Sequence, residues 1–173
     1  LVEALSASDV AYRLPQAPGS SWWPQRFNVQ RSENEPWLGE ALATIDHELA
    51  ALVGGGLPLK RIVLVGFSQG ACLVAEHLAR RPQGVAGAAV LTGALVGADD
   101  EWRGPDGRLD GIPVAFTTSA LDGWVPVERV RSSAQAFVEA GADVTLQIDN
   151  DPDHRIGPDA FAAVERLLAG VAA

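Results

Sequence analysis

The residues that decide the fold are Leu64-Val65-Gly66-Phe67-Ser68-Gln69-Gly70-Ala71. Residues 61–65 are mainly β-branched or aliphatic, which is typical of a parallel strand buried on both faces, and Gly66 is expected to end that strand. Residues 71–79 are apolar on all but one edge, which predicts a buried helix. Ser68 therefore lies on a sharp turn from a strand into a helix.

This turn predicts a nucleophile elbow. A G-x-S-x-G pattern alone is weak, because a glycine-rich connection can contain a serine that has no chemical role. The flanking strand and helix strengthen the prediction, since an elbow is a strained turn that holds a serine hydroxyl above the carboxyl edge of a sheet. We expect Gly66 and Gly70, two residues before and after Ser68, to leave room where side chains would collide.

The composition indicates one globular domain, residues 1–173. The chain has 173 residues with 47% hydrophobic content, enough for one substantial core. A formal net charge of -9 and the lack of any basic stripe argue against nucleic acid as a partner. The single cysteine, Cys72, is expected to be a packed and unreactive thiol. With no membrane-length apolar run and no signal-like opening segment, we expect no membrane span and a cytoplasmic protein.

Strand patterns alternate with helix patterns along the chain. Strands are predicted at residues 10–14, 61–65, 85–91, 112–118 and 143–148. Residues 1–5 are predicted to be the tail of a helix, and further helices are predicted at 36–52, 71–80, 127–138 and 158–171. Such alternation predicts an α/β fold, a parallel sheet with helices on both faces.

A serine hydroxyl becomes a good nucleophile only when a base takes its proton and a third group orients that base. Of the three histidines, His47 falls on the polar side of a predicted helix, and His77 is too far along the helix that follows the elbow. His154 falls between the last strand and the last helix, at the same sheet edge as Ser68. Asp122 follows the strand at 112–118 and reaches that edge too. We therefore predict that Ser68, Asp122 and His154 act together.

Three motif blocks resemble those of the bacterial phospholipase/carboxylesterase family, α/β-hydrolases related to acyl-protein thioesterases. They are Gly66-Phe67-Ser68-Gln69-Gly70-Ala71, Leu121-Asp122-Gly123-Trp124-Val125-Pro126 and His154-Arg155-Ile156. The order Ser, Asp, His is also that of the α/β-hydrolase triad. The resemblance covers nearly the whole chain, but Asp153 stands where the family has glycine. It implies Ser68 as nucleophile, Asp122 as acid and His154 as base, acting on carboxylic esters, thioesters or lysophospholipids without a metal or organic cofactor.

The resemblance is incomplete at the front of the chain. The amide of Gln69 is the predicted donor of one half of an oxyanion hole. In the family the other half comes from a His-Gly loop after an early strand, and this sequence has no such segment. We therefore expect an α/β-hydrolase fold that lacks its N-terminal strands here. The working protein is expected to contain a further N-terminal segment of a few dozen residues, or to receive that strand from another copy in a homo-oligomer.

The expected partner is a small-molecule acyl ester. Trp22, Trp23, Trp124 and Ile156 are the predicted walls of its acyl site, because loops at the carboxyl edge of a parallel sheet converge on the ligand. Aromatic residues in loops pack onto the core more often than they line a pocket, so packing remains the alternative for Trp22 and Trp23.

Two other classes of function compete with this hypothesis. Asp149, Asp151 and Asp153 alternate like the start of a calcium loop, but His154 stands where such a loop needs glycine and Ala160 where it needs glutamate. No metal site is therefore predicted. The second alternative is a catalytically silent or truncated hydrolase domain that binds a partner or a hydrophobic ligand, and ester turnover by the purified chain separates it from an enzyme.

Overall fold

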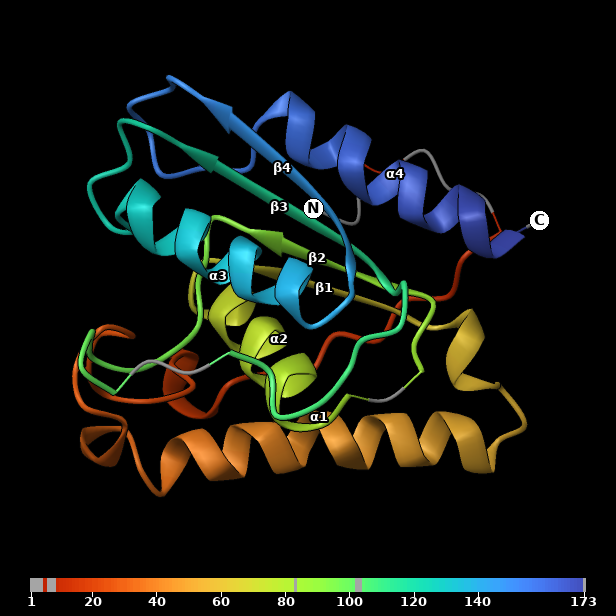
Figure 1. Ribbon diagram of the computed structural model, residues 1–173. Coiled ribbons are helices and arrows are strands. Elements are labelled where there is room, and N and C mark those ends of the chain that lie inside the picture. Colours follow the sequence, from red (N-terminus) through yellow and green to blue (C-terminus); the bar gives the residue numbers. More distant parts are fainter. Residues whose placement is uncertain (1–4, 6–8, 83, 102–103, 173) are drawn as a thin grey trace.

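One parallel sheet forms the centre of the structure (Figure 1). The computed structural model describes residues 5, 9–82, 84–101 and 104–172. The sheet has four strands in the order β1-β2-β3-β4, and every neighbouring pair is parallel. The strands are β1 (Val63–Phe67), β2 (Gly87–Leu91), β3 (Pro113–Ser119) and β4 (Asp143–Asp149). Because all four run in the same direction, their carboxyl ends lie along one edge of the sheet.

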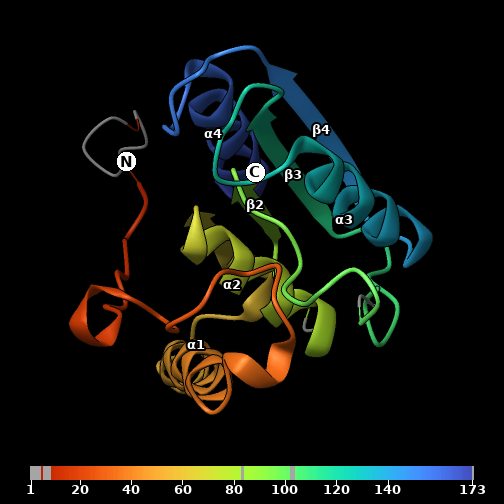
Figure 2. The same cartoon turned by 90° about the vertical axis from the view of Figure 1, so that its left-hand side faces the viewer.

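Helices cover both faces of this sheet. They are α1 (Trp37–Gly54), α2 (Gln69–Arg80), α3 (Val127–Glu139) and α4 (Pro158–Ala172). Figure 2 shows α4 on one side of the sheet and α3 on the other. Helix α2 packs on the same face as α3, and α1 packs on the outside of α2. The predicted α/β fold with helices on both faces is confirmed.

The core consists of two apolar layers, one on each face of the sheet. In β2, Ala89 and Leu91 face α4 and pack with its Val164. The alternate residues, Ala88 and Val90, face α2 and α3. Since all five residues of β2 are buried, this strand has no polar face, and its sequence is continuously apolar rather than alternating.

Three strand predictions differ from the structure by two residues or more, and the first is β2, which begins at residue 87 rather than 85. Strand β1 begins and ends two residues later than expected, because residues 59–61 form a 3₁₀ turn, and it continues through Gly66. Residues 10–14 have no regular secondary structure. A strand needs a hydrogen-bonded neighbour, and among the described residues β1 pairs with β2 alone. The helix expected at residues 1–5 lies, except for Leu5, outside the described residues.

His77 is a buried ionisable group in α2. Its side chain is 1% exposed, and its Nε2 donates to Asp46 Oδ1 at 2.9 Å. Asp46 also pairs with Arg81, which balances the carboxylate charge. Burial lowers the pKa of His77 to about 4, so this histidine is neutral in the folded protein at pH 7.

This burial makes stability depend on pH. Below the ordinary histidine pKa of 6.5, the unfolded chain binds a proton that folded His77 does not bind until about pH 4. The free energy of unfolding should therefore fall as the pH drops through this window, by about 2 to 3 kcal/mol. Urea unfolding near pH 7 and near pH 4.5 measures the change. The His77→Gln variant should show a smaller drop than the parent, and equal drops would contradict this assignment.

Candidate active site

Ser68 occupies a strained turn between β1 and α2. Its φ and ψ are 54° and -121°, a conformation that residues with a side chain rarely adopt. The Ser68 N–H donates to Leu91 O at 3.0 Å, and Ser68 O accepts from the N–H groups of Ala71 and Cys72 at 3.0 Å each. These bonds fix the turn to the end of β2 and to the start of the helix.

Gly66 makes this turn possible. A Cβ at Gly66 would lie 2.1 Å from the carbonyl oxygen of Gly70, so only glycine fits. A Cβ at Gly70 would meet no atom within 4 Å, so the expected crowding is correct for Gly66 and wrong for Gly70. A similar approach occurs at Gly93, where a Cβ would lie 2.4 Å from the Cβ of Ala71. No pattern in the sequence points to Gly93, because the approach joins two segments distant in the chain.

The two glycines of the motif should therefore respond differently to alanine. Gly66→Ala forces backbone atoms apart and should lower the free energy of unfolding by about 3 kcal/mol or more. Gly70→Ala adds a methyl group to open space in the first turn of α2 and should change it by less than about 1 kcal/mol. Urea unfolding of both variants tests this difference. Similar losses at the two positions would mean that the close approach at Gly66 is not the constraint.

The structure brings Ser68, His154 and Asp122 into one hydrogen-bonded chain. His154 Nε2 lies 2.8 Å from Ser68 Oγ, and His154 Nδ1 lies 2.7 Å from Asp122 Oδ2. The other two histidines lie elsewhere, His47 exposed on α1 and His77 buried in α2. A carboxylate only accepts hydrogen bonds, so Asp122 places the proton on Nδ1 and leaves Nε2 free to accept from the serine hydroxyl.

Asp122 is fixed as an anion. Its side chain is 1% exposed, and its Oδ1 accepts from the backbone N–H groups of Trp124 at 2.7 Å and Val125 at 2.8 Å. Burial alone would raise the pKa of Asp122, but hydrogen bonds from His154 and from these two N–H groups outweigh it and hold the pKa below its ordinary value. The carboxylate therefore stays charged and oriented toward the imidazole.

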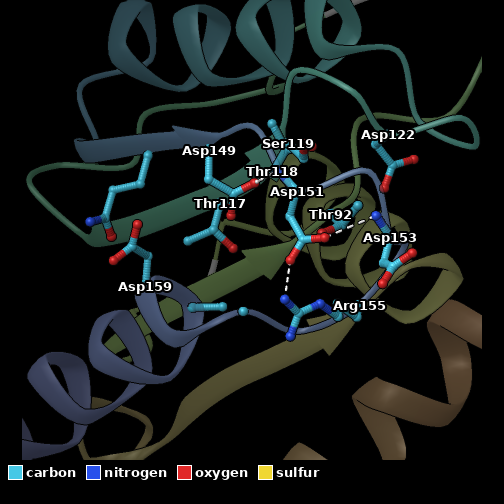
Figure 3. A pocket seen from close by; sticks show the side chains of 13 residues that line it. Thr92, Thr117, Thr118, Ser119, Asp122, Asp149, Asp151, Asp153, Arg155 and Asp159 are labelled. Carbon is cyan, nitrogen blue, oxygen red and sulfur yellow. Dashed lines mark hydrogen bonds and ion pairs between the residues drawn. The ribbon is translucent and has the colours of Figure 1, made fainter.

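The loop that carries His154 is shaped by the alternating aspartates. Asp149 Oδ1 accepts from the N–H of Asp151, and Asp151 Oδ1 accepts from the N–H of Asp153, both at 3.0 Å. Asp151 Oδ2 pairs with Arg155, as Figure 3 shows. The hydrogen bonds that Asp151 accepts from the N–H of Asp153 and from Arg155 hold the pKa of Asp151 below its ordinary value. Within the described residues, no group of three or more His, Cys, Asp or Glu side chains is placed to hold a metal ion. The Asp-x-Asp-x-Asp pattern thus builds the histidine loop.

Aromatic rings and a small cavity surround the imidazole and the acid. The ring of His154 lies 5.1 Å from that of Phe67 and 6.0 Å from that of Trp124, centroid to centroid. A polar cavity of about 20 Å³ next to Asp122 is lined by Thr92, Thr117 and other polar residues (Figure 3). This volume accommodates about one water molecule. It is too small for an organic substrate.

The side chain of Gln69 anchors residues 21–27, called the aromatic loop because they include Trp22, Trp23 and Phe27. Its Oε1 accepts from the N–H of Trp22 at 2.8 Å, and its Nε2 donates to Trp23 O at 2.9 Å. The side-chain amide thus pairs with the loop backbone as a neighbouring strand would. The sequence did not reveal this role, because the partners are 46 and 47 residues apart.

Asn34 anchors the next part of the same loop in the same way. Its side chain is fully buried, its Oδ1 accepts from the N–H of Gln25 at 2.9 Å and its Nδ2 donates to Arg26 O at 3.0 Å. Farther along, Phe27 O accepts from the N–H of Gly97 at 2.7 Å. Residues 21–27 are therefore tied down without belonging to a helix or strand.

The predicted wall residues occupy different environments. Trp124 is 64% exposed beside His154, whereas Trp22 and Ile156 are half-buried. Trp23 is 2% exposed and belongs to the main core cluster, which agrees with the packing alternative rather than with a pocket wall. Trp22 is half-buried and packs against the same core cluster from its edge.

Cys72 is a buried thiol in α2. It is 1% exposed, and its Sγ accepts from the N–H of Ala94 at 3.4 Å. Burial raises the pKa of Cys72 to about 12, so the reactive thiolate is absent at neutral pH. This environment agrees with the expected packed thiol.

The fold and the serine turn define an α/β-hydrolase, and comparisons with known proteins identify its family. The phospholipase/carboxylesterase family model matches residues 17–171. The chain therefore belongs to the phospholipase/carboxylesterase family. No curated protein matches the sequence.

Several solved structures are similar to this chain. A phospholipase/carboxylesterase from Dyadobacter fermentans is 32% identical with a TM-score of 0.81. The matched part is 90% of this chain and 74% of the Dyadobacter chain. A carboxylesterase from Mesorhizobium loti has 27% identity and a TM-score of 0.68, covering 91% of this chain and 72% of its own. Arabidopsis thaliana SOBER1 is 19% identical with a TM-score of 0.66, covering 88% of this chain and 74% of its own, and shares the fold.

Family and neighbours together make this chain a serine hydrolase of the carboxylesterase type. Among the described residues, no helix is both long enough and apolar enough to cross a membrane.

Proposed function

We propose that this chain hydrolyses small carboxylic esters through an acyl-enzyme on Ser68, with His154 as general base and Asp122 as the orienting acid. The observation that carries this proposal is the hydrogen-bonded chain from Asp122 through His154 to the Ser68 hydroxyl, at distances of 2.7 and 2.8 Å. These distances are within the reach that proton transfer requires.

The first half of the reaction forms the acyl-enzyme. Ser68 Oγ attacks the ester carbonyl carbon while His154 Nε2 takes the hydroxyl proton. The Asp122 carboxylate stabilises the imidazolium that forms. The C–O bond to the alcohol then breaks, and the imidazolium gives its proton to the leaving alkoxide, so that an alcohol departs and the acyl group remains on Ser68.

The second half consumes a water molecule. His154 takes a proton from the water, whose oxygen attacks the acyl carbon. The bond to Ser68 Oγ breaks, and the imidazolium returns the proton to that oxygen. The sum is one ester and one water converted to one carboxylic acid and one alcohol, with Ser68 regenerated.

The backbone N–H of Gln69 is the proposed donor to the oxyanion of both tetrahedral intermediates. Ser68 O accepts from Ala71 and Cys72, so the helical hydrogen bonds of α2 begin after Gln69. N–H groups in the first turn of a helix have no partner within the helix, and the helix dipole favours negative charge there. Such a donor typically contributes about 10² to 10³ in turnover.

The substrate is proposed to contact Trp124, with Trp22 and Ile156 as further walls of the site. Trp124 offers a large exposed ring beside His154, which suits an apolar group. Thioesters and lysophospholipids present the same acyl carbonyl to Ser68 and are included in the proposed substrate range.

Ser68→Ala should abolish ester hydrolysis without unfolding the protein, because it deletes the nucleophilic oxygen and nothing else. We expect turnover of nitrophenyl acetate to fall by about 10³-fold or more. Circular dichroism and thermal unfolding check that the fold is retained. Turnover equal to that of the parent would contradict the assignment of Ser68.

Asp122→Asn should reduce turnover by about 10⁴-fold, because an amide allows the wrong imidazole tautomer. The matched control is Asp106→Asn, the same substitution at an exposed aspartate in the loop between β2 and β3. This control should retain turnover close to that of the parent. Equal losses for the two variants would show that charge removal, rather than histidine orientation, is what matters.

A further inference from the structure

Arg26 places a positive charge beside the site. Its guanidinium carbon lies 5.8 Å from the centroid of the Trp124 ring, and that ring lies 6.0 Å from the imidazole of His154. The guanidinium thus lies next to the indole, and the indole lies next to the imidazole that bonds to Ser68. These three groups are called the row below. Arg26 is exposed at the outer end of this row.

This arginine has no carboxylate within ion-pair distance in the part of the chain that the structure describes. Seven other arginines do have one. The chain has 22 acidic and 13 basic side chains, so carboxylates are abundant and a negative substrate is repelled by the overall charge. The Arg26 guanidinium, one indole ring away from the imidazole of His154, is thus a local positive charge, and it offers planar N–H donors that suit a carboxylate or a phosphate.

The backbone of Arg26 is anchored before any ligand binds. Its carbonyl oxygen accepts from the fully buried side chain of Asn34, which also binds the backbone of Gln25. The guanidinium carbon lies over the ring of Trp124, and this cation–π contact favours the observed orientation. A charge held in this way loses little conformational entropy when an anion binds.

Trp124 and Arg26 lie on the side of His154 where one part of the ester is expected, and the mechanism indicates which part. In the proposed mechanism His154 Nε2 protonates the departing alcohol, so the alcohol part lies next to the imidazole. Trp124 packs beside the same imidazole, and Arg26 lies over Trp124. The alcohol part of the ester is thus directed along this row.

We propose that Arg26 binds an anionic group on the alcohol part of the substrate, so that the site selects esters of alcohols that carry a carboxylate or a phosphate. This inference rests on the proposed ester hydrolysis and adds a substrate class to it. Arg26 takes no part in bond making. It determines specificity through charge and through the planar shape of its guanidinium.

The test compares matched anionic and neutral esters. The substrates are acetate esters of hydroxycarboxylic acids of increasing chain length, each with its neutral carboxamide counterpart, and acid release is followed by pH-stat titration. The quantity measured is the ratio of kcat/KM for the anionic ester to that for the neutral ester. Arg26→Gln should lower this ratio about three- to tenfold at low salt, as expected for one partly exposed ion pair, and Arg26→Lys should retain part of it. Added salt should lower the ratio of the parent protein.

The matched control is Arg61→Gln. Arg61 is also exposed and lies before β1, at the end of the sheet opposite Ser68, so its substitution changes the net charge equally without touching the site. This variant should keep the ratio of the parent. An equal fall in Arg26→Gln and Arg61→Gln would overturn the proposal, because net charge alone would then explain the preference.

A second pair of substrates tests whether Arg26 binds an anionic group on the alcohol part or on the acyl part of the ester. Methyl hydrogen succinate and methyl succinamate carry the charge, or its neutral replacement, on the acyl part. A larger effect of Arg26→Gln on this pair than on the acetate esters would overturn the placement on the alcohol part. An unchanged ratio on both pairs would overturn the role of Arg26, while Ser68-dependent hydrolysis of the neutral esters would leave the proposed function intact. Absence of hydrolysis of every ester by the parent would instead overturn the proposed function.

A phosphate-bearing alcohol is the second source of the same chemistry. Acetyl glycerol phosphate, compared with acetyl glycerol, distinguishes it from a carboxylate. A greater loss for the phosphate ester in Arg26→Gln assigns the preference to phosphate, and a greater loss for the hydroxycarboxylate esters assigns it to carboxylate. No loss in either pair contradicts the proposal.

Discussion

The close approach between Gly66 and Gly70 is the constraint on which the site depends. Because the backbone of α2 passes where a Cβ of residue 66 would be, the chain turns from strand to helix within a few residues. That turn leaves Ser68 at a φ of 54° and places it at the carboxyl edge of the sheet. The conformational cost of one strained residue is of order 1–3 kcal/mol and is offset by the surrounding strand and helix contacts.

The parallel sheet then determines which other residues reach Ser68. The loops that follow β3 and β4 leave the sheet at the same edge as the elbow and carry Asp122 and His154. Each loop has its own local support. Two backbone N–H groups fix Asp122, and a series of aspartate side chains shapes the loop of His154. The distances of 2.7 and 2.8 Å therefore result from separately anchored segments rather than from one shared contact.

Much of this arrangement is predictable from the sequence, because it depends on local patterns. Apolar runs and helical spacing give the order of elements, and that order places Ser68, Asp122 and His154 at one edge. Long-range pairing is what the sequence does not reveal. The side-chain amide of Gln69 forms hydrogen bonds with backbone groups 46 and 47 residues away, and no local pattern encodes this pairing. The predicted end of β1 is wrong for a similar reason. Glycine locally disfavours a strand, but Gly66 pairs with Val90 of the neighbouring strand, and β1 continues to Phe67.

Gln69 connects the chemistry to the shape of the site. Its backbone N–H is the proposed oxyanion donor, while its side chain fixes the backbone of Trp22 and Trp23. A shift of the aromatic loop would therefore act on the residue next to Ser68, and a shift of the turn at Ser68 would move the loop. Asn34 extends the same support to the backbone of Arg26. Because both anchors are side-chain amides, the loop gains the hydrogen bonds of a strand without needing a strand's sequence. The side chains of its exposed residues can thus differ in chemistry while the loop backbone stays in place.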